Sequence, residues 1–321
     1  MNYLIYFDES NKIDQFNERF SYYGAYGASD KSLAEIVKII RKIYIDNHSK
    51  SELHFTKYTK DTNIKKYFKT LNAVITSELR INILIVNNED ALSSAARLGL
   101  NTEELRNLFY IKIPERLFYG LTRDLSDLTK DDKLVSVKLK IDNNEEYEKL
   151  NLNEKLVEQM NAHAAYRNKN YRVMKSITLD SKKSIPLQII DTFMGIVVFL
   201  IEKSYMDNTN STIIKSDLIY RVLIEKANIY RFQKQIKLFE WTGSEELKEI
   251  NIGDYLSSFI VYKSNYDIEE ITKMKDILLT NPSIKTKDLR NIMGYPNTRR
   301  NQLLGYRNHI EGIGRNSFLL N

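Results

Sequence analysis

The chain has 321 residues, 42% of them hydrophobic, so it can bury a large core and is long enough for two domains. It contains no cysteine, which excludes disulfides and thiolate metal sites and is typical of a reducing compartment such as the cytoplasm. The net charge of +6 mildly favours a polyanionic partner, and the longest apolar run, around residues 196–201, is too short to span a membrane.

The first ten residues, MNYLIYFDES, predict a buried strand that ends in acidic residues. Asp8 interrupts the apolar run, so no secretory signal is expected. A carboxylate at the end of a strand can face a cleft, which makes Asp8 the first candidate site residue. Residues 19–27 are aromatic and alternating, and they predict an antiparallel neighbour for this strand.

Helical and extended patterns are mixed over the following residues. Apolar residues at helical spacing predict helices over residues 32–45, 62–79, 101–125, 145–166 and 186–203. An extended segment is expected at residues 51–58, and further strands at 80–88, 133–142 and 171–180. This mixture indicates an α/β domain over residues 1–205. Residues 206–267 are expected to form a helical and irregular connecting region that begins with a polar loop.

Four acids stand out by their positions. Asp8 and Asp142 end apolar strands, Asp191 lies on an otherwise apolar helix, and Glu52 lies beside His54. A carboxylate on an apolar helix needs a partner, and a hard divalent cation bound by oxygen ligands is one candidate. Each acid also has an ordinary explanation: a solvated strand end for Asp142, a helix-dipole role for Asp191, and a surface role for Glu52 and His54.

Several segments, IYFDES, FSYYGAYG, ELHF, KLKIDN and LDSKKSIPLQIIDTFMG, together resemble the bacterial and phage family known as domain of unknown function 3800. The resemblance covers about residues 3–203. It implies a ribonuclease H-like mixed central sheet flanked by helices, with acids on the strands and on the final helix. One departure is Asn11, where the family usually has glycine; asparagine also tolerates a left-handed turn.

The resemblance assigns roles to residues at the matching positions. It implies that the metal-binding acids are Asp8, Asp142 and Asp191, with Glu52 as a weaker match, holding Mg²⁺ or Mn²⁺ as two ions. Ser10, Ser181 and Gln188 occupy supporting positions, and His54 or Lys182 would orient water or neutralise charge on the phosphate. The implied activity is cleavage of DNA or RNA, in phage defence or a mobile element. The alternative is a catalytically inactive nucleic-acid-binding or protein-interaction component.

Residues 268–321 differ in character from the rest of the chain. A helix stopped by Asn281-Pro282, a short helix from Thr286 to Gly294, a basic third helix and a hairpin-like end resemble a winged helix-turn-helix. From Pro282 onward the chain has seven Lys or Arg and two acids, a net charge of +5. This concentration of charge predicts a nucleic-acid-binding module.

The third helix of this module supplies the candidate contacts. Its N-terminal end, where such helices meet base edges, carries Arg299, Arg300, Asn301 and Gln302, and Arg307 and Arg315 are placed to contact phosphate. The other interpretation is a small three-helix unit that docks a protein partner or forms a homodimer.

Overall fold

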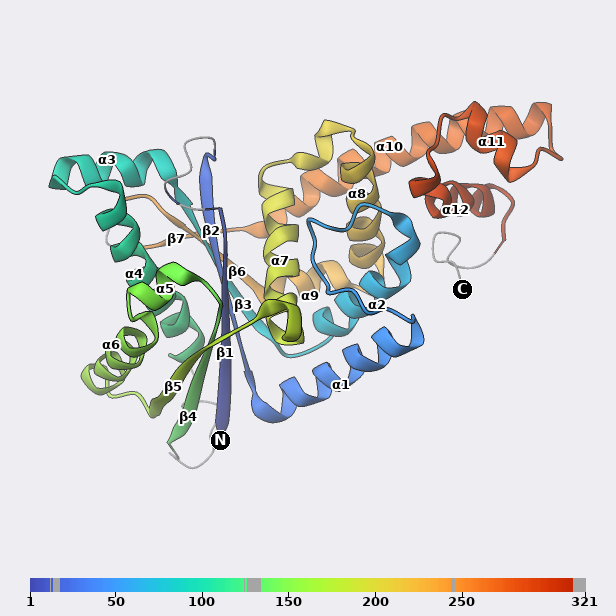
Figure 1. Cartoon of the computed structure of the whole chain (residues 1–321). Coiled ribbons are helices and arrows are strands. Elements are labelled where there is room, and N and C mark those ends of the chain that lie inside the picture. The colour runs from blue at the N-terminus through green and yellow to red at the C-terminus, as the bar shows by residue number, and fades with distance from the viewer. Residues whose placement is uncertain (12, 14–17, 124, 126–133, 244–245, 314–321) are drawn as a thin grey trace.

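The computed structural model describes residues 1–321 except 12, 14–17, 124, 126–133, 244–245 and 314–321 (Figure 1). The described strands are β1 Asn2–Ser10, β2 Phe20–Ser29, β3 Arg80–Asn87, β4 Val135–Asp142, β5 Tyr171–Leu179, β6 Ile236–Trp241 and β7 Lys248–Ile250. The described helices are α1 Asp30–Asp46, α2 Ile64–Ile75, α3 Asn88–Leu98, α4 Thr102–Thr122, α5 Glu145–Lys149, α6 Leu152–Tyr166, α7 Ile185–Ile201, α8 Asn210–Ile224, α9 Asn228–Gln235, α10 Ile252–Thr280, α11 Thr286–Ile292 and α12 Arg300–Ile310. Short 3-10 turns include η1 Asp61–Asn63 and η3 Ser181–Lys183.

The strands form one seven-stranded mixed sheet in the order β5-β4-β1-β2-β3-β6-β7. β1 pairs antiparallel with β2 and parallel with β4, and β4 in turn pairs parallel with β5. On the other side β2 pairs antiparallel with β3, which pairs parallel with β6. The predicted α/β class is therefore confirmed, with a mixed sheet at its centre.

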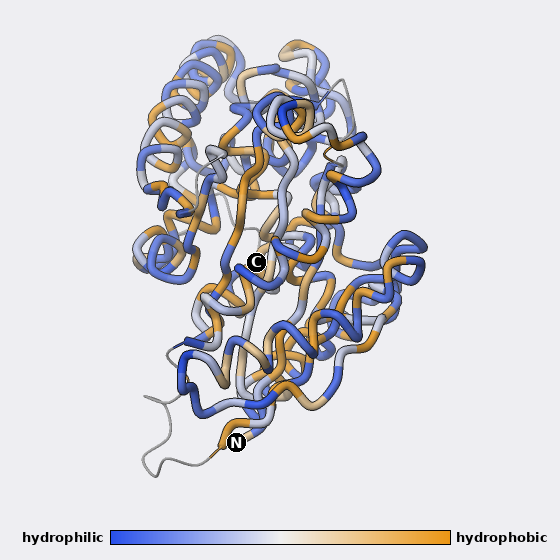
Figure 2. The backbone as a smooth tube through the Cα atoms, turned by 90° about the vertical axis from the view of Figure 1, so that its left-hand side faces the viewer, coloured by the Kyte–Doolittle hydropathy of each residue, from blue (hydrophilic) through white to orange (hydrophobic). Residues whose placement is uncertain are grey.

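Two helical layers cover the sheet (Figure 1). The alternation of side chains along β1 divides them, since successive residues of a strand point to opposite faces. Tyr3, Ile5 and Phe7 belong to the core beneath α3 to α6, whereas Leu4 and Tyr6 belong to the core shared with α1, α2 and α7 to α10. Figure 2 shows hydrophobic stretches running through the interior of the molecule, with hydrophilic turns outside.

Helix α7 packs against β1 and β2. A Cβ atom at Gly24 of β2 would lie 3.0 Å from Cδ1 of Ile190, and one at Gly195 would lie 2.9 Å from Cβ of Phe55. The two glycines therefore let α7 approach the sheet on one side and residues 51–58 on the other. Most of the second half of α7 is buried, and Leu200 is fully buried.

The region 206–267 differs from its prediction as a connection. β6, which includes the single tryptophan Trp241, pairs with β3 and extends the sheet. α8 begins at Asn210, inside the segment predicted to be a polar loop. Thr209 supplies a capping box there, and this local hydrogen bonding begins the helix in spite of its polar sequence.

The expected boundary at residue 268 lies inside a single helix. α10 runs without interruption over Ile252–Thr280, so it belongs to both the main unit and the C-terminal one. Buried polar contacts add to this continuity: Lys263 bonds Asp267, and the hydroxyl of Tyr306 donates to the same carboxylate. The C-terminal helices are therefore attached through a shared helix and not through a flexible linker.

Candidate active site

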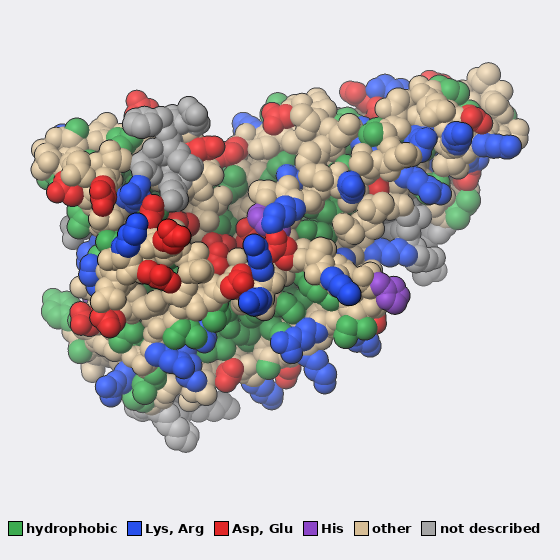
Figure 3. Space-filling model, in the orientation of Figure 1, with side chains coloured by type: hydrophobic (Ala, Val, Ile, Leu, Met, Phe, Trp, Pro, Cys, Tyr) green, Lys and Arg blue, Asp and Glu red, His purple; other side chains and the backbone are tan. Residues whose placement is uncertain are grey.

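One pocket of about 350 Å³ opens where the ends of β1 and β4 meet the first turns of α7 and residues 51–58. Its polar lining comes from positions far apart in the sequence: Asp8, Glu9, Ser10, Asn11, Glu52, His54, Thr56, Asp142, Ser181, Gln188 and Asp191. Figure 3 shows acidic side chains gathered in a hollow at the centre of this face, beside a histidine. The candidate residues of the α/β domain thus line one pocket, with the exception of Lys182.

Strand pairing brings Asp8 and Asp142 to the same place. β1 and β4 run parallel and Phe7 pairs with Ile141, so the next residues along the two strands are Asp8 and Asp142. Phe7 and Ile141 pack in the core beneath α4 and α6. Because side chains alternate, Asp8 and Asp142 point to the opposite face, on which α7 places Asp191.

Asp8 is the most buried of these carboxyls, at 9% exposure. Burial is the main cause that raises its pKa well above the ordinary value, and the negative charges of Asp191 and Asp142 raise it further. One hydrogen bond opposes this effect, from the Glu9 amide to Oδ1 of Asp8 at 2.8 Å. The ionised form of Asp8 is therefore poorly compensated by the protein alone.

Asp142 is held in place by the turn that precedes α7. The backbone amide of Ser181 donates to Oδ1 of Asp142 at 3.1 Å. Burial raises the pKa of Asp142, and hydrogen bonds from the backbone and side chain of Ser181 oppose that rise. The backbone amide of Ser181 thus orients a carboxylate of the pocket.

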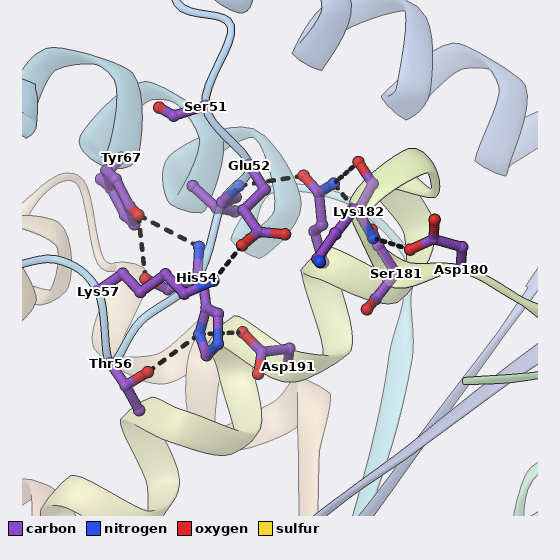
Figure 4. A network of polar contacts seen from close by, with 12 residues as sticks. Ser51, Glu52, His54, Thr56, Lys57, Tyr67, Asp180, Ser181, Lys182 and Asp191 are labelled. Atoms are coloured by element: carbon purple, nitrogen blue, oxygen red, sulfur yellow. Dashed lines mark hydrogen bonds and ion pairs between the residues drawn. The ribbon is translucent and has the colours of Figure 1, made fainter. Parts of the chain in front are cut away.

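Asp191 lies against His54, as Figure 4 shows. Nδ1 of His54 lies 3.1 Å from Oδ2 of Asp191 and 3.2 Å from the hydroxyl oxygen of Thr56. Oδ2 of Asp191 is buried, yet it accepts no hydrogen bond with good geometry from the described residues. His54 is therefore its only close partner among the described residues, and a buried carboxylate oxygen without a well-aligned hydrogen bond is a candidate ligand for a cation.

Glu52 lies on the pocket wall and is bound by Lys57. The hydrogen bond from Lys57 lowers the pKa of Glu52, and the charges of His54 and Lys182 act in the same direction. Lys182 is exposed and lies outside the pocket lining, so its side chain acts on the site through the electrostatic attraction between its charge and the Glu52 carboxylate. Glu52 is thus neutralised by a lysine, unlike Asp8.

Gln188 joins three segments around the pocket. Its Oε1 accepts hydrogen bonds from the Tyr44 hydroxyl at 3.0 Å and the Leu53 amide at 3.1 Å. Its Nε2 donates to the carbonyls of Ser181 at 2.9 Å and Lys182 at 3.2 Å. At 5% exposure this amide uses both lone pairs and both hydrogens. Gln188 therefore positions residues 51–58 and the turn at Ser181 relative to α7.

Two further residues complete the rim of the pocket. Asn11 has a φ of 62°, in the left-handed region, which asparagine adopts more readily than most residues other than glycine. Glu9 was given no role by the sequence, but it lines the pocket, and its Oε1 accepts from Asn144 at 2.8 Å. In the sequence, the only indication of a role for Glu9 was its position beside Asp8. Alternation of side chains along a strand predicts, however, that Glu9 points away from the face that carries Asp8.

Three lysines continue the same face of the sheet away from the pocket. Lys138 and Lys140 alternate with buried residues along β4, and Lys175 lies on β5. Burial, together with the positive charges of Lys175 and Lys138, lowers the pKa of Lys140. The three ammonium groups are therefore close enough to repel one another.

The N-terminal end of α12, predicted to meet base edges, is turned toward the rest of the protein. Arg299 is 6% exposed and donates to Gln302 at 2.9 Å and to the Tyr266 hydroxyl at 2.8 Å. Oδ2 of Asp61 accepts from the amides of Asn301 at 2.6 Å and Gln302 at 3.1 Å. A distant carboxylate therefore caps α12, and the buried side chains of Arg299, just before the helix, and of Gln302 have partners within the protein.

The other basic residues of this unit have mixed surroundings. Arg300 is exposed, whereas Arg307 donates to Glu311 at 2.6 Å and to the carbonyl of Ile284 at 2.9 Å. Arg315 and the expected hairpin-like end lie outside the described residues. Of the residues expected to bind nucleic acid, Arg300 remains the clearest exposed cation of the described part.

Comparison with protein-family models and with curated proteins found no match for the chain. Within the described ranges, no helix is both long and apolar enough to cross a membrane. Over the same ranges, no three His, Asp or Glu side chains are grouped closely enough to hold one metal ion. The site is therefore a pocket lined by several carboxylates, of which no three described ones lie close enough together to share one metal ion.

Proposed function

We propose that this protein is a divalent-metal-dependent nuclease with a ribonuclease H-like domain. The observation that carries the proposal is the meeting of Asp8, Asp142 and Asp191 in one pocket, from the parallel strands β1 and β4 and from α7, which packs on β1 and β2. A mixed central sheet with acids on its strands and on a following helix is also what the resemblance to the domain of unknown function 3800 family implies. The substrate would be DNA or RNA.

The chemistry of the pocket fits Mg²⁺ or Mn²⁺. These hard ions take oxygen ligands and usually retain some water, so a few carboxylates suffice. Asp8 is buried among like charges, and Oδ2 of Asp191 is buried without a hydrogen bond from the described residues. Cations held by Asp8, Asp142 and Asp191 would compensate all three carboxylates.

Bound ions would lower the pKa of water and stabilise the leaving oxygen of a phosphodiester. The protein's own residues would do the positioning. Ser181 fixes the position of Asp142, Gln188 fixes the position of the pocket wall, and His54 contacts Asp191. His54 would orient water in the pocket through its other ring nitrogen.

The test is cleavage of labelled DNA and RNA in the presence of Mg²⁺ or Mn²⁺. Asp8→Asn and Asp191→Asn should each lower the rate at least about 100-fold, since even the loss of residues that orient metal ligands costs 10- to 100-fold. Asp180→Asn is the matched control, because Asp180 ends β5 but does not line the pocket. Full activity in both pocket variants would overturn the site assignment.

A second candidate function is a catalytically inactive binding component. It is favoured by the absence, in the described residues, of three side chains already grouped around one ion. The two candidates differ in their response to Mn²⁺: a metal site present in the folded state must raise the melting temperature, and an inactive fold without one must not. Deletion of residues 268–321 would cut through α10, so point variants are the better test of the C-terminal unit.

A further inference from the structure

The lysine strip, formed by Lys138, Lys140 and Lys175, lies on the face of the sheet that carries Asp8 and Asp142. Along β4, alternate residues are buried, and the half-exposed ones include Lys138, Lys140 and Asp142. Two residues of a strand span about 6.6 Å, so the strip begins about 6.6 Å from Asp142 and extends to about 13 Å. The strip itself therefore spans roughly two nucleotides of a stacked strand, at about 3.4 Å each, and the stretch from Asp142 to Lys138 spans roughly four.

A β-bulge places Lys175 in this strip. Val137 pairs with Val173, but Lys138 pairs with Lys175, because the register shifts between Val137 and Lys138. Val173 is buried in the core beneath α6. With regular pairing, Lys175 would share that buried face; the extra residue, Met174, turns it to the side of Lys138.

This arrangement is unfavourable in the absence of a ligand. Like charges on neighbouring strands repel one another, and the strip has no hydrogen bond or ion pair to a carboxylate among the described residues. α7 packs on β1 and β2, and it leaves the same face of β4 half-exposed. The strip is thus an accessible row of positive charge that the protein itself does not neutralise.

The negative charge of the pocket means that an anionic substrate requires positive charge nearby in order to bind. On their own, Asp8, Asp142 and Asp191 would repel a phosphodiester, and the N-terminal end of α12 is occupied by Asp61. The lysine strip is the concentration of positive charge nearest to Asp142 along the sheet. Lysine binds phosphate as a point charge without reading sequence.

We propose that the lysine strip binds the phosphate backbone of a nucleic acid and leads it along β4 and β5 into the carboxylate pocket. The inference rests on the proposed function for the identity of this polymer as the substrate. It adds the face of the molecule on which the substrate lies, and it assigns backbone binding to the sheet instead of the buried end of α12.

The test is the salt dependence of binding, measured by fluorescence anisotropy with labelled single-stranded and duplex DNA and RNA. The full-length protein is used in EDTA, where a metal-dependent nuclease does not cut. The variant is Lys138→Gln with Lys175→Gln, which leaves Lys140 beside the pocket unchanged. The control is Lys149→Gln with Lys155→Gln, which removes two exposed charges from α5 and α6 on the other face of the sheet.

Loss of two phosphate contacts should make the plot of log affinity against log salt shallower by about 1.8 for duplex or about 1.4 for a single strand. Between about 50 and 200 mM salt, the wild type would then lose about tenfold more affinity for duplex than the strip variant. The control variant should keep the wild-type slope. The comparison of single strand with duplex shows which form lies on the strip.

Three results would overturn the inference: the same slope in the strip variant and the control, no binding by the wild type, or aggregation of the strip variant with unchanged binding. The last would mean that Lys175 merely protects the edge strand β5. Cleavage by the wild type is scored separately. If the wild type cuts nucleic acid but the strip variant and the control have the same salt slope, the lysine strip is rejected and the proposed nuclease function is retained. If the strip variant has a shallower slope but the wild type does not cut, the binding surface is retained and the nuclease function is rejected.

Discussion

Replacement of Asp8 by asparagine would distinguish the loss of stability caused by a buried charge from the role of that charge in binding a metal ion. Asparagine keeps a side-chain oxygen that can accept the 2.8 Å hydrogen bond from the Glu9 amide. It removes the charge that Asp191 and Asp142 repel. In a protein free of divalent ions, Asp8→Asn should therefore be more stable than the wild type at neutral pH.

The sign of this effect follows from the raised pKa of Asp8. A carboxyl with a raised pKa binds its proton more tightly in the folded state than in the unfolded state. Its contribution to stability is present below the unfolded pKa, about 3.9, and is lost as the pH rises through the folded pKa. The wild type should approach the variant in stability near pH 4 and fall below it at pH 7.

The magnitude is modest but measurable. A stabilising substitution typically adds about 0.5–2 kcal/mol to the free energy of unfolding. At an unfolding entropy of about 2.1 cal/mol/K per residue, one kcal/mol shifts the melting temperature of a chain of 321 residues by about 1.5 °C. We therefore expect Asp8→Asn in EDTA at pH 7 to melt about 1–3 °C above the wild type. At 100 times its Kd, Mn²⁺ should stabilise the wild type by about 2.7 kcal/mol and the variant far less.

Differential scanning fluorimetry in EDTA and across a Mn²⁺ titration, at pH 4 and pH 7, measures both effects. Asp180→Asn is the matched control, because its side chain also accepts a backbone hydrogen bond, from Lys182 at 2.9 Å, but stands outside the pocket. The reasoning is refuted if Asp8→Asn melts no higher than the wild type in EDTA at pH 7 and Mn²⁺ stabilises both equally.

Two other predictions follow from buried hydrogen bonds. Gln188→Leu should lower the free energy of unfolding by about 1–3 kcal/mol in urea denaturation and should slow cleavage, because the Leu53 amide loses its partner and the Ser181 carbonyl loses one of its two donors. Thr192→Val, one turn further along α7, is the control, and wild-type stability and activity in Gln188→Leu would contradict the positioning role. Burial raises the pKa of Asp61 to about 6, so the stability that its protonated form contributes is full below about pH 4 and is lost as the pH rises through about 6. Asp61→Asn should remove this fall from denaturation curves collected between these pH values, and an unchanged pH dependence would disprove the assignment.

Local pattern was sufficient to predict much of the pocket. The apolar run before Asp8 and the regular alternation before Asp142 indicated strands that end in acids, and both strands have those ends. The apolar surroundings of Asp191 indicated a carboxylate in need of a partner, and its Oδ2 is buried. These features depend on neighbours within one strand or one helix, for which the repeats of 2.0 and 3.6 residues apply.

The failures concern contacts between distant segments. β6 was missed because its run, IKLFEW, mixes apolar and charged residues, and only its pairing with β3 shows it to be part of the sheet. Arg299 and Gln302, around the start of α12, had the composition of a nucleic-acid-reading helix. Both are buried, and the amide of Gln302 bonds Asp61, about 240 residues away, a contact that no local pattern could reveal.

The sequence by itself determined which residues end the first and fourth strands in a carboxylate, and which helix carries a third. The tertiary structure decided that the three carboxylates share one pocket, because the parallel register of β1 and β4 aligns Asp8 with Asp142 and the close packing of α7 brings Asp191 to them. It also decided which positive charges remain exposed: a bulge in β5 adds Lys175 to the accessible face, while Arg299, just before α12, is buried against Tyr266. Charge is a property of the residue, but its availability to a ligand depends on what packs against it.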